Sequence, residues 1–112
     1  MMKHLMNVII KMLVFINMIN LVSIKPSTVK GKKMTAVFNI DGKKKTVNFG
    51  ASNYSDYTIH HDEERKKRYI ARHQKNENWK DPTKAGTLSR YILWEYKNKQ
   101  KAIKMYKKLF KL

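Results

Sequence analysis

The residues Met34–Ala51, "MTAVFNIDGKKKTVNFGA", decide the fold of this chain. Every second residue of the first half is apolar, which is the period-two pattern of a half-buried strand. Asp41-Gly42 then predicts a type I′ turn, because such a turn needs positive φ at both central positions. Lys43–Ala51 returns as the partner strand, and Gly50 marks its end. The stretch therefore predicts an antiparallel β-hairpin.

A further strand is expected before the hairpin. Leu21–Ser27, "LVSIKPS", is rich in β-branched residues and alternates, and Pro26 is typical of a strand end or an edge strand. A turn around Gly31 connects this segment to the hairpin. We therefore expect Leu21–Ala51 to form a three-stranded antiparallel meander.

The first 20 residues, "MMKHLMNVIIKMLVFINMIN", are mostly apolar and differ from the rest. They have the form of a signal peptide with Met12–Val22 as its hydrophobic region, or of a membrane anchor that Lys11 and several asparagines interrupt. A leader, or a start placed too early, is a third alternative. The apolar pattern of the remaining chain is complete without them. We therefore expect an N-terminal extension over residues 1–20 and a single basic domain over residues 21–112.

Helical periodicity replaces the strand pattern after the hairpin. Asp62, Glu63 and Glu64 suit a helix N-terminus, where negative charge is favourable. Tyr69 and Ile70 follow as the apolar stripe of the same helix. This helix is expected to end near residue 75.

Two more helices are expected in the last third of the chain. Asp81 suits the N-cap of the first of them and Pro82 its first helical position. Its expected inward residues are Leu88, Tyr91, Ile92 and Tyr96. Lys99–Leu112 has the pattern of a last amphipathic helix. The predicted fold is α+β: a small three-stranded antiparallel sheet packed with about three helices.

The composition narrows the class of function. The chain has 112 residues, with 25 Lys and Arg against 8 Asp and Glu, and a formal net charge of +17. Like charges at this density repel one another, so we expect an anionic partner. Nucleic acid is the first candidate and an acidic protein surface the second; a membrane is a partner only if residues 1–22 are a true signal or anchor. The absence of cysteine excludes disulfides, thiolate metal sites and thiol nucleophiles.

The expected contacts to nucleic acid come from three basic groups, at the hairpin tip, on the first long helix and on the last helix. Clusters of Lys and Arg bind phosphates without reading the sequence. The predicted nucleic-acid-binding residues are Lys43, Lys44, Lys45, Arg65, Lys66, Arg68, Arg72, Lys101, Lys104, Lys107, Lys108 and Lys111. We expect them to form one continuous face.

The stretch Ser55–Trp79 gathers histidines and carboxylates and raises the alternative of an active site. His60 and His61 are adjacent, so their side chains diverge, and His73 follows without the spacing that places two metal ligands on one helix face. A small metal-dependent nuclease around His60, His61 and Glu64 remains an alternative. We favour a charged helix surface, and we predict no catalytic residue, no metal site and no cofactor.

Aromatic side chains offer a second possible contact to nucleic acid. Tyr91, Trp94 and Tyr96 lie close together in the second of the expected helices. Such rings stack on bases in some proteins. More often they belong to the core and its rim, which is the place we expect for them, with a stacking platform as the alternative.

The motifs between Phe49 and Trp94 carry a resemblance. They are F-G, Y-S-D-Y-T, R-Y-I-A-R-H, E-N-W and A-G-T-L-S-R-Y-I-L-W, in this order. In these motifs the chain resembles an uncharacterised family of short basic proteins encoded by giant nucleocytoplasmic large DNA viruses. The match begins near Val22 and departs from the family's pattern at Lys84-Ala85-Gly86 and after Trp94. The resemblance implies that the residues before Leu21 are an extension.

Charge and resemblance together predict a non-enzymatic, sequence-tolerant nucleic-acid-binding protein of viral genome packaging or of the virus factory. The alternative is a minor capsid or cement protein whose basic face meets acidic capsid or virion proteins. The expected location is the virion or the host cytoplasm, and secretory or membrane targeting comes second.

Overall fold

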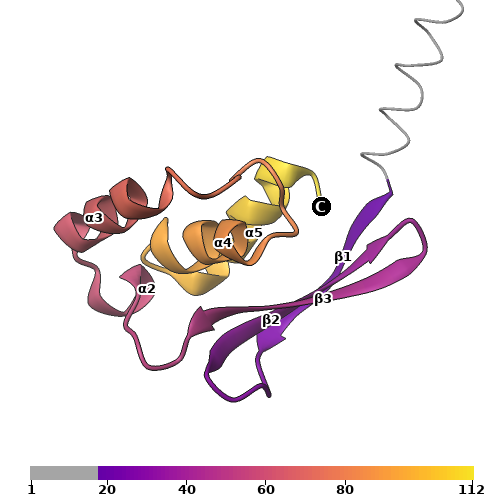
Figure 1. Ribbon diagram of the computed structural model, residues 1–112, viewed down its shortest axis with the longest axis horizontal. Coiled ribbons are helices and arrows are strands. Elements are labelled where there is room, and N and C mark those ends of the chain that lie inside the picture. The colour runs from indigo at the N-terminus through magenta and orange to yellow at the C-terminus, as the bar shows by residue number, and fades with distance from the viewer. Residues whose placement is uncertain (1–17) are drawn as a thin grey trace, which may run out of the picture.

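The computed structural model describes residues 18–112, which form a three-stranded sheet and a group of helices (Figure 1). The strands are β1 (Ile19–Pro26), β2 (Lys32–Ile40) and β3 (Lys43–Ala51), antiparallel in the order β1-β2-β3. The predicted α+β class and the meander are confirmed. Asp41 and Gly42 have φ of 52° and 77°, the positive values that the type I′ turn requires.

β1 begins two residues before its predicted start at Leu21. Ile19 and Asn20 already pair with β2, and Ile19 lies opposite Ile40. Both therefore belong to the sheet rather than to the expected extension. Residues 1–17, with most of the possible signal or anchor segment, lie outside the described residues. No helix in the described part of the chain is long and apolar enough to cross a membrane.

A β-bulge adapts β1 to the core. The register with β2 shifts between Leu21 and Ser23, which makes Val22 the extra residue. The Val22 side chain is accordingly 63% exposed. Leu21 and Ile24 are three positions apart, so a regular strand would place them on opposite faces. The bulge lets both pack against the core.

The helices follow the sheet in sequence. They are α2 (Tyr57–His60), α3 (Glu63–His73), α4 (Ala85–Leu88), which continues into the π-helical turn η1 (Ser89–Trp94), and α5 (Lys99–Phe110). Asp56, Asp62 and Asn98 cap α2, α3 and α5, because their side chains accept hydrogen bonds from backbone amides of the first turn. The predicted helices near residues 62–75 and 99–112 are confirmed within a few residues. The short helix α2 was not expected from the sequence.

The predicted helix start at Asp81 and Pro82 is wrong. The Asp81 carboxylate accepts hydrogen bonds from the backbone N–H and the hydroxyl of Thr83, at 2.9 and 2.8 Å, and so closes a turn. The helix α4 begins later, at Ala85. The proline did not distinguish the two structures, because its fixed φ suits the first turn of a helix and a β-turn equally.

The continuous helix α4–η1 presents a different inward face from the one predicted. Leu88, Ile92 and Leu93 are buried, whereas Tyr91 is only partly buried and Tyr96 lies beyond the end of η1. A π-helical turn holds more residues than an α-helical turn, so the inward positions shift along the sequence. An α-helical period therefore does not predict the burial of Leu93.

The core lies between one face of the sheet and the helices α4, η1 and α5 (Figure 1). Its buried side chains are Met34, Ala36, Phe38, Val47, Phe49, Leu88, Ile92, Leu93 and Tyr106. The Tyr106 hydroxyl donates to the carbonyl of Pro82 at 2.6 Å, which joins α5 to the loop before α4. α3 contacts α2 and η1 at the end of the molecule away from the Asp41–Gly42 turn.

Candidate nucleic-acid interface

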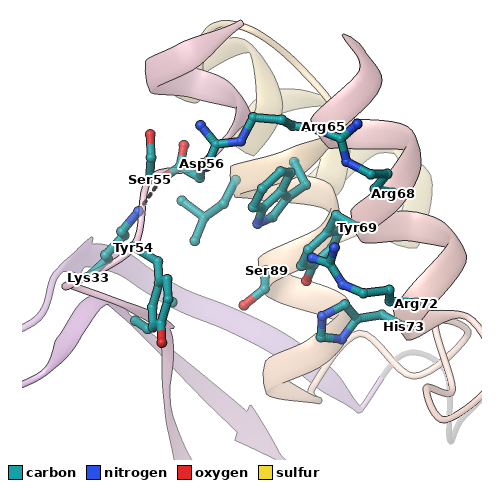
Figure 2. A pocket seen from close by; sticks show the side chains of 14 residues that line it. Lys33, Tyr54, Ser55, Asp56, Arg65, Arg68, Tyr69, Arg72, His73 and Ser89 are labelled. Atoms are coloured by element: carbon teal, nitrogen blue, oxygen red, sulfur yellow. Dashed lines mark hydrogen bonds and ion pairs between the residues drawn. The ribbon is translucent and has the colours of Figure 1, made fainter. Parts of the chain in front are cut away.

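A pocket of about 510 Å³ opens between α3 and the end of the sheet (Figure 2). Its walls come from β2, the end of β3, the loop before α2, α3 and η1. Gly50 forms part of the floor with φ of 79°. A Cβ at this position would lie 2.6 Å from Cδ1 of Leu93, which is buried. Glycine is therefore required for the close approach of β3 to η1.

Three arginines of α3 line one side of the pocket. Arg65, Arg68 and Arg72, here called the arginine row, follow at i, i+3 and i+7 and therefore share one helix face. All three are exposed. Within residues 18–112 no carboxylate oxygen lies within 4.0 Å of their guanidinium nitrogens. The row is thus a concentration of positive charge that forms no close ion pair with the described part of the protein.

Behind the arginine row stands an aromatic stack. The ring of Tyr69 lies between those of His73 and Trp94, at centroid distances of 4.3 and 4.2 Å, and is nearly parallel to Trp94. His60 covers Trp94 from another side at 5.3 Å. Burial raises the pKa of Tyr69 to about 12, so its hydroxyl stays protonated at neutral pH. These contacts join α2, α3 and η1 and make the wall rigid.

A buried ion pair joins the sheet to the loop before α2. Lys33 Nζ lies 2.5 Å from a carboxylate oxygen of Asp56, and the side chains are 13% and 1% exposed. Asp56 also accepts hydrogen bonds from the backbone N–H of Thr58, at 2.9 Å, and from its hydroxyl. Lys33 and Asp56 both line the pocket, and their charges offset each other. The positive charge of the pocket therefore comes from α3.

The predicted basic residues do not form one continuous face. The hairpin tip with Lys43 and Lys44 lies at the opposite end of the molecule from α3, and α5 lies between them (Figure 1). The exposed lysines of α5 are Lys101, Lys104, Lys107 and Lys108, and the exposed Lys111 follows as the C-cap of this helix. The predicted basic groups are thus distributed over the molecule, and of the predicted contact residues only Arg65, Arg68 and Arg72 line the pocket.

Two predicted contact residues have partners inside the protein. Lys45 Nζ donates to the hydroxyl of Thr83 at 3.1 Å. Lys66 Nζ donates to the carbonyl of Glu95 at 2.9 Å and lies 5.0 Å from the ring centre of Tyr57. Both residues are partly buried, and they connect β3 to the loop before α4 and α3 to the end of η1. Their first role is structural.

The alternative of a stacking platform at Tyr91, Trp94 and Tyr96 does not agree with the geometry. Trp94 is covered by other rings of the protein. Tyr91 packs edge-on against Phe110 at 5.7 Å, and Lys101 lies 5.8 Å from the ring centre of Tyr96. The three rings have separate neighbours. Their contacts are those of core and rim residues, as expected, rather than those of a stacking platform.

The two adjacent histidines have local structural roles. The backbone N–H of Asp62 donates to His60 Nδ1 at 2.9 Å. His61 ends α2 with φ of 55°, and its Nε2 lies 3.1 Å from the carbonyl of Thr58. Within residues 18–112, no three His, Cys, Asp or Glu side chains are grouped as metal ligands would be. Glu64, the third residue named for the nuclease alternative, lies in the first turn of α3, and its backbone N–H donates to the Asp62 carboxylate at 3.0 Å.

His60 makes the stability of the fold depend on pH. Burial, followed by the charge of Arg65, lowers the pKa of His60 below its ordinary value of 6.5. As the pH falls, the unfolded chain therefore protonates at His60 before the folded protein does. The stabilisation from neutral His60 is complete above pH 6.5 and is lost as the pH falls through the lower pKa of the folded state. We expect His60→Ala to weaken this pH dependence of the urea midpoint and His61→Ala to retain it. Identical profiles for the wild type and His60→Ala would contradict this role.

Several pocket residues were missed by sequence reasoning. Tyr54 is 75% exposed and lines the pocket together with Lys33 and Asp56, which form the buried ion pair. Asp56 two residues before Thr58 is a recognisable cap signal, but nothing local indicates Lys33 as its partner. The i, i+3, i+7 spacing of the α3 arginines was the one signal of the site present in the sequence itself.

The chain is similar to a known protein family over part of its length. The model of a family of unknown function (DUF5754) matches residues 22–73, which is less than half of the chain and extends from β1 to the end of α3. No curated protein and no solved structure matches the chain. The matched residues include Lys33, Tyr54, Asp56 and the arginine row.

Proposed function

We propose that this protein binds nucleic acid through the phosphate backbone, without catalysis and without reading the base sequence. One observation carries the proposal: the arginine row lines a pocket, and no carboxylate oxygen of the described chain lies within 4.0 Å of its guanidinium nitrogens. The guanidinium group is planar and donates two parallel hydrogen bonds to one phosphate, so a row of three suits consecutive phosphates.

The lysines of α5 and of the hairpin tip support the same proposal in another way. They are exposed and carry charge that adds to the total of +17. Charge of one sign spread over a small domain attracts a polyanion from a distance and holds it in many orientations. The proposed role of the lysines is attraction, and that of the arginine row is the direct contact.

Binding to duplex DNA is expected to weaken steeply as salt rises, with log K linear in log salt. Each phosphate contact contributes about 0.9 to the slope, because it releases condensed counterions. The variant with Arg65, Arg68 and Arg72 changed to glutamine should lose about that much slope for each contact removed. Fluorescence anisotropy of a labelled duplex, titrated at several salt concentrations, measures it.

The matched control removes the same charge elsewhere. Lys101, Lys104 and Lys107 are exposed on α5, and their change to glutamine should weaken binding less than the arginine variant does. Equal losses in the two variants would remove the arginine row from the proposal. Binding that does not change with salt concentration, or that is absent at about 50 mM salt, would contradict the proposed function itself.

The resemblance to proteins of giant DNA viruses extends the proposal to a place of action. We propose that the polyanion is a viral genome, bound in the virion or in the virus factory of the host cytoplasm. Nuclease treatment of opened particles should then release the protein. Retention on the capsid after that treatment would favour a minor capsid or cement protein instead.

A further inference from the structure

The pocket holds features that a groove for duplex phosphates would not need. It is a concave site of about 510 Å³, within the range of about 300–1,000 Å³ that is usual for small-molecule sites. The phosphates of a duplex lie on a convex ridge and are contacted on open surfaces. A concave pocket beside the arginine row has room for a group that projects from the nucleic-acid backbone.

Tyr54 supplies an open aromatic face at this pocket. It lies on the sheet side, across from Arg72 and His73 of α3 (Figure 2). The side chain is 75% exposed, the most exposed large hydrophobic side chain among residues 18–112. Trp94 and Tyr69 are covered by neighbouring rings, as described above. Tyr54 is thus the most exposed ring of the pocket and is available to stack on a planar ligand.

The remaining walls suit a base with an attached phosphate. Ser89 of η1 directs its hydroxyl toward the hollow and can exchange hydrogen bonds with a base edge (Figure 2). The Asp56 carboxylate, which would repel a phosphate, is 1% exposed and neutralised by Lys33. The arginine row supplies positive charge on the opposite side. The pocket therefore combines an aromatic face, a polar floor and a cationic wall.

We infer that the pocket binds one unpaired nucleotide of a single-stranded nucleic acid, with the base stacked on Tyr54 and the phosphate held by the arginine row. This inference rests on the proposed function and names its substrate class. A paired base stays stacked within the duplex and cannot reach Tyr54, so the pocket distinguishes single strands and strand ends from intact duplex.

The test compares the full chain with its Tyr54→Ala and Tyr54→Phe variants. The probes are a labelled oligothymidylate and a duplex of equal length, each at about 50 mM salt. Tyr54→Ala should weaken single-strand binding about 5- to 140-fold, the equivalent of losing one base–aromatic stack, and leave duplex binding unchanged. Tyr54→Phe should keep the single-strand affinity. Because Tyr54 is exposed, both variants should keep the wild-type thermal midpoint.

The outcomes separate this inference from the proposed function. If the arginine variant loses duplex binding while Tyr54→Ala binds single strands as the wild type does, the nucleotide pocket is wrong and the phosphate contact stands. If no nucleic acid binds, both are wrong. Tyr96→Ala removes a ring outside the pocket, and an equal loss in that variant would overturn the assignment to Tyr54. So would a Tyr54→Ala defect seen with phosphatidylserine vesicles and not with oligothymidylate.

Discussion

Replacing Asp56 by alanine is expected to lower the free energy of unfolding by about 3–5 kcal/mol. The carboxylate is 1% exposed and accepts the Lys33 ammonium at 2.5 Å together with two hydrogen bonds from Thr58. Without it, Lys33 keeps a charge that is largely removed from water and has lost its counter-ion, and α2 loses its cap. A domain of this size has only about 5–15 kcal/mol in total, so urea denaturation should show a large fall in the midpoint.

An exposed ion pair provides the control for Asp56. Glu64 and Lys67 lie 3.7 Å apart on α3, and their side chains are 71% and 72% exposed. Water screens this pair, so Glu64→Gln should change the free energy of unfolding by only about 0–1 kcal/mol. A loss in Asp56→Ala that is no larger than in Glu64→Gln would show that the buried pair does not hold the sheet to the loop.

Replacing Tyr69 by alanine is expected to cost about 3–5 kcal/mol of stability, as for other large aromatic side chains in cores. The side chain is 8% exposed, and its ring is the middle member of the stack with His73 and Trp94. Its removal leaves a cavity between α3 and η1, and the rings of His73 and Trp94 lose the ring that lies between them. Thermal unfolding followed by circular dichroism measures the loss.

Tyr69→Phe is the matched variant for this prediction. It keeps the ring and the stacking distances and removes only the hydroxyl, which makes no hydrogen bond among the described residues. We expect a change below about 1 kcal/mol. If Tyr69→Phe were as unstable as Tyr69→Ala, the hydroxyl and not the stack would hold α3 in place.

Both positions bear on binding as well as on stability. Asp56 and Tyr69 line the pocket from opposite sides, and each is held by contacts between elements distant in the chain. A wall that is rigid before the ligand arrives loses less conformational entropy on binding. The stability of these two contacts therefore sets how well the arginine row and Tyr54 are prepared for an anionic ligand.

The hairpin and the two long helices were predictable from the sequence because their signals are local. Asp41-Gly42 specifies a turn through the φ values its residues accept, and the alternation beside it specifies which face is buried. Asp62 is a helix cap that acts on its own next three residues. Each of these signals operates within one turn or one strand pair, so these elements do not depend on tertiary contacts for their position in the sequence.

The start of α4 and the path of η1 were not predictable in the same way. Asp81 and Pro82 suit a turn and a helix start alike, and the contact of Pro82 with Tyr106 of α5 belongs to the folded state. The π-helical turn places Leu93 beside Leu88 and Ile92 in the core, where it fills the space over Gly50. Tertiary contacts decided both, with α5 at Pro82 and with the sheet at Leu93.

The arginine row and the strong positive charge are properties of the sequence alone, since helical spacing and composition determine them. The pocket is not, because Lys33, Asp56 and Tyr54 come from β2 and from the loop after β3, while the row comes from α3. Side chains this far apart in the chain meet only after the sheet and helices have packed. The same packing gave Lys45 and Lys66 partners inside the protein. Hydrogen-bond partners across tens of residues are chosen by the tertiary structure, and no local pattern in the sequence encodes them.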